Sequence, residues 1–139
     1  MFEYVHKVHY YETDKMGIVH HSNYIRWMEE ARVDFLDEIG ASFAEMEARG
    51  LQSPVVGVNC KYRRPTRFDD RVRVRVSIEK YNGAVLKVAY EMYNETTGEL
   101  ACTGSSEHCF LDSSGKLVAL HRCCADIDAA IRKHVRSEN

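Results

Sequence analysis

Four residues near the N-terminus carry groups from which a hydrolytic site could be built: Asp14, Gly17, His20 and His21. The carboxylate of Asp14 could act as a nucleophile or a base, and Gly17 would let the backbone approach a ligand. A predicted helix follows, and its first N–H groups, near residues 20–23, could bind a developing oxyanion. This combination suits acyl transfer. From spacing alone, however, a turn-capping role for Asp14 is the simpler interpretation.

The other acid–base groups nearby have two interpretations each. Either histidine could orient a substrate carbonyl or a water, or simply cover the helix start. Adjacent residues point in different directions, so we expect only one of them to face a site. Glu29 and Glu30 are rival acids. Glu30 lies four residues after Arg26, which predicts an ion pair between them, and this leaves Glu29 as the weaker catalytic alternative.

The pattern of apolar residues predicts the elements that position this stretch. Residues 3–11 alternate as a strand, residues 12–21 form a loop, and Ser22 or Asn23 can cap a helix of about 17 residues that ends at Gly40. The helix carries an apolar stripe at helical spacing, made of Tyr24, Trp27, Met28, Ala31, Phe35 and Ile39. A shorter helix is predicted over residues 43–49.

From Pro54 onward the period changes to two. Strands are predicted over residues 55–62, 70–79, 86–93 and 99–111, with a possible extension over 116–120. The pair Asn82-Gly83 predicts a type I′ hairpin. A terminal helix is expected from about residue 122 to 135. The order of elements indicates one α+β domain over residues 1–139, with a curved antiparallel sheet around one helix, and its open edges favour association.

Composition excludes several classes of function. The formal net charge of −2 argues against a nucleic-acid partner, and no apolar run is long enough to span a bilayer. The first residues lack the pattern of a signal peptide, so we expect a cytoplasmic protein whose five cysteines are reduced thiols. Their spacing matches no zinc pattern, so no metal site is predicted.

Two groups of basic residues stand out. The row Arg71, Arg73 and Arg75 is either a solvated face, a subunit contact or a phosphate-binding surface. A second group comprises Lys61, Arg63, Arg64 and Arg67, to which Ser105 and Ser106 could add hydroxyl donors. A basic patch on a nearly neutral chain fits a polyanionic small molecule better than a long nucleic acid. No glycine-rich phosphate loop precedes a helix, which disfavours a nucleotide triphosphate enzyme.

Residues 11–24, YETDKMGIVHHSNY, resemble the signature loop of the 4-hydroxybenzoyl-CoA thioesterase-like acyl-CoA thioesterases. Residues 29–32 also resemble this family's helix, and residues 62–65 with 68–70 resemble a strand connection. The resemblance extends over nearly the whole chain. It implies the hotdog fold, in which a curved five-stranded antiparallel sheet wraps around one long central helix, here with an additional C-terminal helix.

The resemblance also implies roles for the residues of the loop. Asp14 would be the catalytic carboxylate, and the backbone N–H of His21 would polarise the thioester carbonyl. One branch of the family carries a histidine at this position that is thought to assist catalysis, so the His21 side chain is a second candidate. Gly17, Ile18 and Val19 would shape the site.

Substrate binding is expected to involve other parts of the chain. Tyr24, Trp27 and Met28 are candidates for the acyl pocket, although their bulk is equally explained by the core. Arg63, Arg64 and Ser105 are candidates for the coenzyme A phosphates. The family's dimers join two sheets edge to edge and each site uses both chains, so a homodimer is the expected minimum and a homotetramer is favoured. No metal or redox cofactor is expected.

The expected reaction is hydrolysis of a small or medium acyl-CoA to a carboxylic acid and free coenzyme A. One alternative is a non-hydrolytic hotdog protein that binds acyl-CoA or acyl-carrier protein. Another is a dehydratase-like lyase. A third is a structural partner protein that acts through the face formed by Arg71, Arg73 and Arg75.

Overall fold

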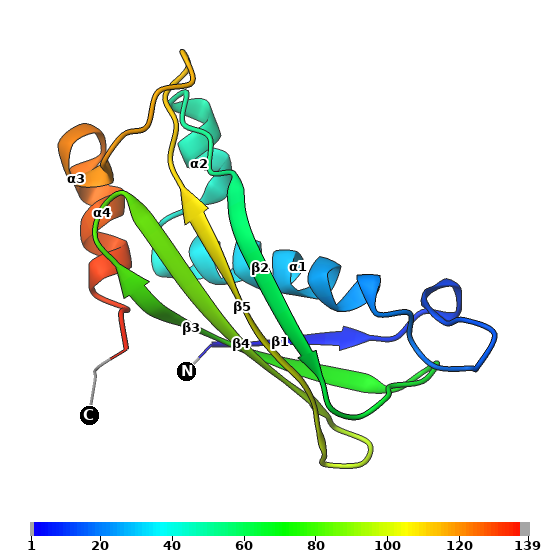
Figure 1. Ribbon diagram of the computed structural model, residues 1–139. Helices are drawn as coiled ribbons and strands as arrows, with labels where there is room; N and C mark the ends of the chain where they lie inside the picture. The colour runs from blue at the N-terminus through cyan, green and yellow to red at the C-terminus, as the bar shows by residue number, and fades with distance from the viewer. Residues whose placement is uncertain (1, 137–139) are drawn as a thin grey trace.

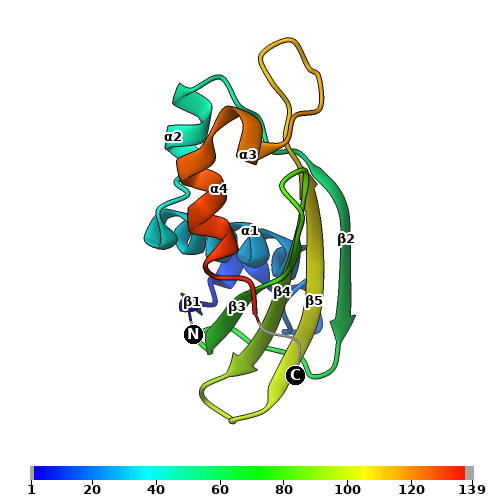
Figure 2. The same ribbon diagram turned by 90° about the vertical axis from the view of Figure 1, so that its left-hand side faces the viewer.

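Five antiparallel strands form a single sheet in the spatial order β1-β3-β4-β5-β2 (Figure 1). The computed structural model describes residues 2–136. The strands are β1 (Phe2–Lys7), β2 (Val55–Tyr62), β3 (Arg71–Tyr81), β4 (Val85–Asn94) and β5 (Leu100–Cys109). The helical elements are the 3₁₀ turn η1 (Tyr10–Glu12), α1 (Ser22–Ile39), α2 (Phe43–Ala48), α3 (Leu120–Cys123) and α4 (Ala125–Arg132). The fold places α1, α2 and α4 on one side of the curved sheet (Figure 2).

The core lies between the inner face of this sheet and α1. Successive strand residues point to opposite faces, and the predicted alternation is confirmed in β3 and β4. The inward residues are buried: Val72, Val74, Val76 and Ile78 from β3, and Leu86, Val88, Tyr90 and Met92 from β4. Antiparallel pairing aligns these two rows, with Val74 opposite Met92 and Val76 opposite Tyr90.

The 18-residue helix α1 presents its apolar stripe to this core. Tyr24, Trp27, Met28, Ala31 and Phe35 are all buried, as the spacing predicts. The helix ends at Gly40, which adopts the left-handed conformation with φ of 91°, also as predicted. Its start differs from the prediction, because His21 occupies the capping position and no side chain within residues 2–136 caps the helix.

The first strand is shorter than expected and ends at Lys7. The chain then closes into η1, where the N–H of Glu12 donates to the carbonyl of His9 at 3.0 Å and the N–H of His9 donates to the Glu12 carboxylate at 2.7 Å. Burial of Glu12 requires partners for its carboxylate, and the turn supplies one of them.

Two further predictions are wrong. The β3–β4 connection is not a type I′ turn, because Asn82 lacks the required positive φ; instead its side-chain oxygen accepts the N–H groups of Ala84 and Val85. Residues 116–120 add no strand, and only an isolated bridge joins Leu111 to Leu117. The predicted terminal helix is present but divided at Cys124, whose extended φ of −146° separates α3 from α4.

The outer face of the sheet carries the arginine row with its own carboxylate partners. Arg73 contacts Glu95 at 2.6 Å, and Arg75 contacts Glu3 at 3.2 Å while lying over the ring of Tyr93. These paired charges support the interpretation of this row as a solvated face. Within residues 2–136, no helix is long and apolar enough to cross a membrane.

Gly104 of β5 provides a test of how tightly α1 packs on the sheet. A Cβ at this position would collide with the Asn59 carbonyl oxygen and the Met28 methyl group. Gly104→Ala is therefore expected to lower the free energy of unfolding by about 1–3 kcal/mol, measured by urea denaturation. Gly57→Ala in β2, where no atom lies within 4 Å of the added carbon, is the matched control and should stay within about 1 kcal/mol of wild type. Equal stability of the two variants would contradict this packing.

Candidate active site

Residues 13–19 form a tight loop held by its own backbone. The N–H of Asp14 donates to the carbonyl of Ile18, and the N–H of Gly17 donates back to the carbonyl of Asp14, both at 2.9 Å. Gly17 has a φ of 78°, a conformation that residues with a side chain adopt reluctantly. The loop is fixed to the rest of the fold by the N–H of Val19, which donates to the carbonyl of Thr66 at 2.8 Å.

The two oxygens of Asp14 have different environments. Oδ1 accepts the backbone N–H of Met16 at 2.8 Å, so the carboxylate does cap the turn. Oδ2 forms no hydrogen bond with any residue in the range 2–136. The two interpretations of the sequence are therefore compatible, because one oxygen can hold the orientation of the side chain while the other stays available for chemistry.

The start of α1 supplies one unsatisfied donor. The N–H of Ser22 donates to His20 Nδ1 at 3.3 Å, and the N–H of Asn23 donates to the carbonyl of His20 at 3.0 Å. The backbone N–H of His21 has no acceptor in the described part of the chain. A free N–H at a helix start is a natural donor to a negatively charged oxygen.

Asp14 and His21 line the same pocket, with a volume of about 540 Å³. The loop contributes Met16, Ile18 and Val19, α1 contributes Tyr24, and the segment after β2 contributes Tyr62, Arg63, Arg64 and Pro65. The pocket thus combines an acid, a free N–H, apolar walls and two guanidinium groups. The backbone N–H groups of Arg63 and Arg64 both donate to the carbonyl of Ala101, at 2.8 and 3.1 Å, which fixes where this basic segment lies.

A family model described as the Thioesterase-like superfamily matches residues 8–132. This chain belongs to that superfamily. The predicted relation to the hotdog-fold thioesterases is thereby confirmed.

Known relatives match most of the chain of this thioesterase-like protein. The Bacillus subtilis (strain 168) protein named "Putative acyl-CoA thioesterase YneP" is 37% identical over 128 residues, covering 91% of this chain and 92% of the relative. The DHNA-CoA thioesterase structure from Staphylococcus aureus is 37% identical, with a TM-score of 0.90, covering 94% of this chain and 88% of that chain. The structure of the hypothetical protein TT1821 from Thermus thermophilus is 34% identical, with a TM-score of 0.88 and coverage of 95% and 98%.

Several candidate residues of the thioesterase-like chain lie outside this pocket. Gly17 forms the turn but does not line the pocket. Trp27 is fully buried and its ring packs 4.9 Å from that of Tyr24, whereas Met28 lines a different cavity. Ser105 accepts a hydrogen bond from Asn59 at 2.6 Å on the β2–β5 pair and is not among the lining residues. The pocket gathers the other seven: Asp14, Ile18, Val19, His21, Tyr24, Arg63 and Arg64.

Tyr62 was not predicted as a site residue. Its hydroxyl donates to the carbonyl of His21 at 3.4 Å, and its ring lies 6.0 Å from the His21 ring and 5.4 Å from that of Tyr24. It therefore links the sheet to the start of α1. The sequence offers two signals for it, its place beside Arg63 at the end of a predicted strand and the resemblance of residues 62–65 to a strand connection of the thioesterase family.

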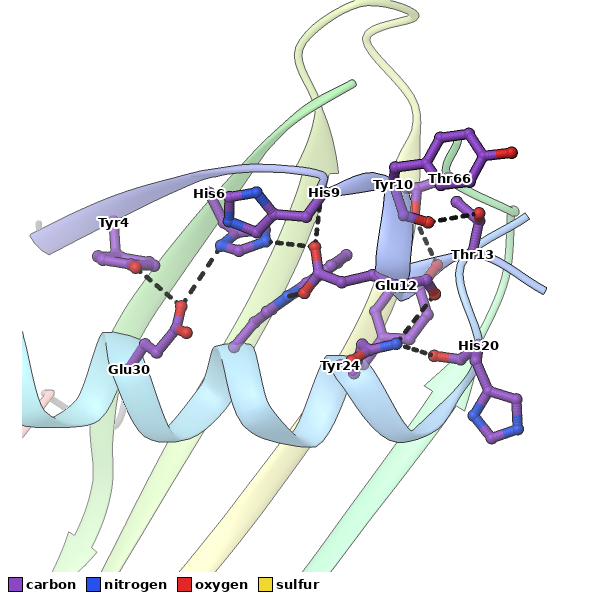
Figure 3. Close-up of polar contacts among 12 residues, drawn as sticks. Tyr4, His6, His9, Tyr10, Glu12, Thr13, His20, Tyr24, Glu30 and Thr66 are labelled. Atoms are coloured by element: carbon purple, nitrogen blue, oxygen red, sulfur yellow. Dashed lines mark hydrogen bonds and ion pairs between the residues drawn. The ribbon is translucent and has the colours of Figure 1, made fainter. Parts of the chain in front are cut away.

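Glu12, also missed by the sequence reasoning, lies at the centre of a buried network (Figure 3). Its Oε1 pairs with His6 Nε2 at 2.8 Å, and its Oε2 accepts the indole N–H of Trp27 at 2.8 Å. The backbone carbonyl of Glu12 accepts the N–H of His20 at 2.8 Å and the side-chain amide of Asn23 at 3.0 Å. One residue thus connects β1, the active-site loop and α1.

The network extends to Glu30, whose expected pairing with Arg26 is wrong. Glu30 Oε2 instead accepts the Tyr4 hydroxyl at 2.8 Å and lies 3.4 Å from His6 Nδ1 (Figure 3). His6 therefore lies between two carboxylates. The side chains of His6, His9 and Glu12 place ligand atoms within 4.8 Å of one another and could surround a metal ion. Hydrogen bonds already satisfy the Glu12 carboxylate, however, so we assign the cluster a structural role.

The contacts of Glu12 predict how the free energy of unfolding changes as the pH falls. Burial alone raises the pKa of Glu12, but hydrogen bonds from His6, His9 and Trp27 outweigh it, so the pKa lies below its ordinary value of 4.5. The ionised carboxylate therefore stabilises the fold above the unfolded-state pKa, and this stabilisation is lost as the pH falls through the lower folded-state pKa. Glu12→Gln should lower the free energy of unfolding by about 1–3 kcal/mol near pH 7 and should flatten its decline below pH ~4.5.

Urea unfolding of both proteins between pH 3 and pH 7 measures this effect. Glu47→Gln changes an exposed glutamate of α2 and serves as the control. Parallel pH profiles for wild type and Glu12→Gln would show that the carboxylate does not contribute as described.

Proposed function

We propose that this protein is an acyl-CoA thioesterase that hydrolyses a small or medium acyl-CoA to a carboxylic acid and coenzyme A. One observation carries the proposal: the available oxygen of Asp14 and the unpartnered N–H of His21 line one pocket. The same activity is supported by membership of the Thioesterase-like superfamily. It is also supported by relatives that are named as acyl-CoA or DHNA-CoA thioesterases.

In the proposed reaction, the thioester carbonyl oxygen accepts the N–H of His21, which stabilises the negative charge that develops on it. Asp14 then acts by one of two routes. As a nucleophile it attacks the carbonyl carbon, the C–S bond breaks, and water cleaves the resulting mixed anhydride. As a general base it removes a proton from water while that water attacks the carbonyl carbon; the C–S bond then breaks, and the leaving thiolate takes up the proton. Either route yields the carboxylic acid and the coenzyme A thiol, and neither requires a metal or redox cofactor.

The His21 imidazole remains a second candidate for assisting this step. Its ring lies 4.3 Å from that of His20, whose Nδ1 is within 2.9 Å of the Ser22 hydroxyl. Tyr24 and Tyr62 give the pocket aromatic walls, which fits a short or aromatic acyl group. A panel from acetyl-CoA to aromatic acyl-CoA esters would establish the preference.

We further propose that residues 1–139 form one domain in which the sheet wraps around α1 as its central helix, and that two copies associate through the edge strand β2. That edge exposes Val55, Val56 and Val58, which are 54%, 58% and 44% accessible. Light scattering in solution would decide between monomer, dimer and tetramer. The five free thiols fit a cytoplasmic location.

Asp14→Asn tests the catalytic assignment. The variant keeps an oxygen that can accept the Met16 N–H, so the loop should fold normally, while kcat for thiol release should fall by about 10²–10⁴-fold. Thiol release from acyl-CoA is followed with a thiol-reactive dye. Asp37→Asn, an exposed acid on α1, is the control. Unchanged turnover of Asp14→Asn would refute the assignment, and tight acyl-CoA binding by wild type without thiol release would favour the non-hydrolytic alternative.

Arg63 and Arg64 are the proposed contacts for the coenzyme A phosphates. Arg64 already lies 3.4 Å from Glu99, whereas Arg63 has no ion-pair partner among the described residues. Arg63→Gln should therefore raise KM for acyl-CoA by about tenfold and leave kcat nearly unchanged, with a smaller effect for Arg64→Gln. The corresponding N-acetylcysteamine thioester lacks the phosphates, so its KM should not change. If KM rose equally for both substrates, Arg63 and Arg64 would contact the acyl end of the substrate instead of the phosphates.

A further inference from the structure

A second, smaller cavity of about 120 Å³ lies between α1 and the inner face of the sheet. It shares no lining residue with the catalytic pocket. Its polar wall consists of Arg32 from α1, Tyr90 from β4, and Ser106 and His108 from β5. All four side chains are at least nine-tenths buried, with accessibilities of 4%, 2%, 5% and 0% in that order.

Two polar atoms of this wall, Arg32 Nη1 and His108 Nδ1, have no hydrogen-bond partner among residues 2–136. Buried polar atoms are nearly always paired, because an unpaired one loses its hydration without compensation. A buried guanidinium is the more demanding case, since its charge also needs a counterion. Burial lowers the pKa of Arg32, and Glu29 at the rim of the cavity is the carboxylate that acts against this shift.

The remaining groups form a chain of hydrogen bonds that determines which ring nitrogen of His108 carries the proton. The Tyr90 hydroxyl lies 2.7 Å from Ser106 Oγ, which lies 2.7 Å from His108 Nε2. Burial and the nearby charge of Arg32 lower the pKa of His108 to about 3, so its ring is neutral. If each hydroxyl donates to the next member, Nε2 accepts and Nδ1 carries the proton. The cavity then offers two N–H donors and one positive charge, that of Arg32, which no carboxylate of residues 2–136 contacts in an ion pair.

The opposite side of the cavity is apolar and partly open to solvent. Ile25 of α1 and Val58 of β2 are 42% and 44% exposed, and Val55 lies beside them. A ligand that fits both sides has a negatively charged head with two acceptor oxygens and a short hydrocarbon tail. Water could fill the space but would not bring a negative charge into direct contact with Arg32.

We propose that this cavity is a binding site for short-chain carboxylates. The two carboxylate oxygens accept N–H groups from Arg32 and His108, and the alkyl tail packs against Ile25, Val55 and Val58. The site is separate from the catalytic pocket and does not depend on the proposed hydrolysis. A second copy seated on the β2 edge would close the mouth over the bound acid.

The histidine ring signals of the full-length protein, observed by NMR, provide a direct test. Sodium formate, acetate and butyrate are added at constant ionic strength, with chloride as the balancing salt. We expect the His108 signals to shift saturably in the millimolar range, with affinity rising about three- to fourfold for each added methylene. Acetamide, which has the shape of acetate but no charge, should bind at least about tenfold more weakly.

Three variants test where the carboxylate binds and which charge attracts it. Arg32→Met should weaken butyrate binding at least about tenfold. Glu29→Gln, a change at an exposed residue that removes the competing carboxylate, should strengthen binding and tests the proposal even if Arg32→Met fails to fold. Arg63→Gln removes an arginine of the catalytic pocket and should leave binding unchanged.

Three results would overturn the proposal. The first is a His108 shift that does not saturate or is absent, as expected if water or a partner side chain fills the cavity. The second is equal binding of acetamide and acetate. The third is a response that is lost in Arg63→Gln but not altered in Glu29→Gln, which would place the acid in the catalytic pocket.

Discussion

Burial of the Glu12 carboxylate is the constraint on which the rest of the active-site region depends. A carboxylate removed from water must find hydrogen-bond donors, and here they come from His6, the backbone of His9 and Trp27. These donors belong to β1, to the turn after it and to α1, so hydrogen bonds to one carboxylate hold the three segments together. The carbonyl of Glu12 then receives the N–H of His20, and the position of the free N–H at His21 follows from this contact.

The sequence predicts those parts of the fold that depend on local periodicity. The alternation in β3 and β4 and the stripe of α1 are visible because each buried face repeats at the period of its element. Local periodicity does not predict the backbone where a distant contact decides its course. After Lys7 the chain leaves β1 for the turn in which buried Glu12 accepts the indole N–H of Trp27, and the β3–β4 turn depends on the side chain of Asn82. Neither interaction has a periodic signature.

The candidate site shows the same division. Asp14 and His21 share one short stretch, so motif and helix-start arguments could identify them together. Tyr62 joins them only because β2 ends beside the start of α1, which no local pattern reveals. Trp27 and Met28 lie on the predicted apolar stripe, yet one supports Glu12 and the other lines a different cavity. Because Tyr24 on the same stripe lines the catalytic pocket, residues on one helix face serve three separate environments.

The way the basic segment after β2 is anchored has a consequence for how such proteins diversify. Arg63 and Arg64 are held by backbone contacts to Ala101, and the loop of Asp14 is held by its own backbone and by Thr66. These anchors use backbone atoms, and Asp14 is the one pocket side chain described above that also holds its own loop, through Oδ1. Evolution could therefore exchange the residues that meet one end of a substrate without disturbing the machinery at the other. New specificities would then arise by piecemeal substitution, without a redesigned scaffold.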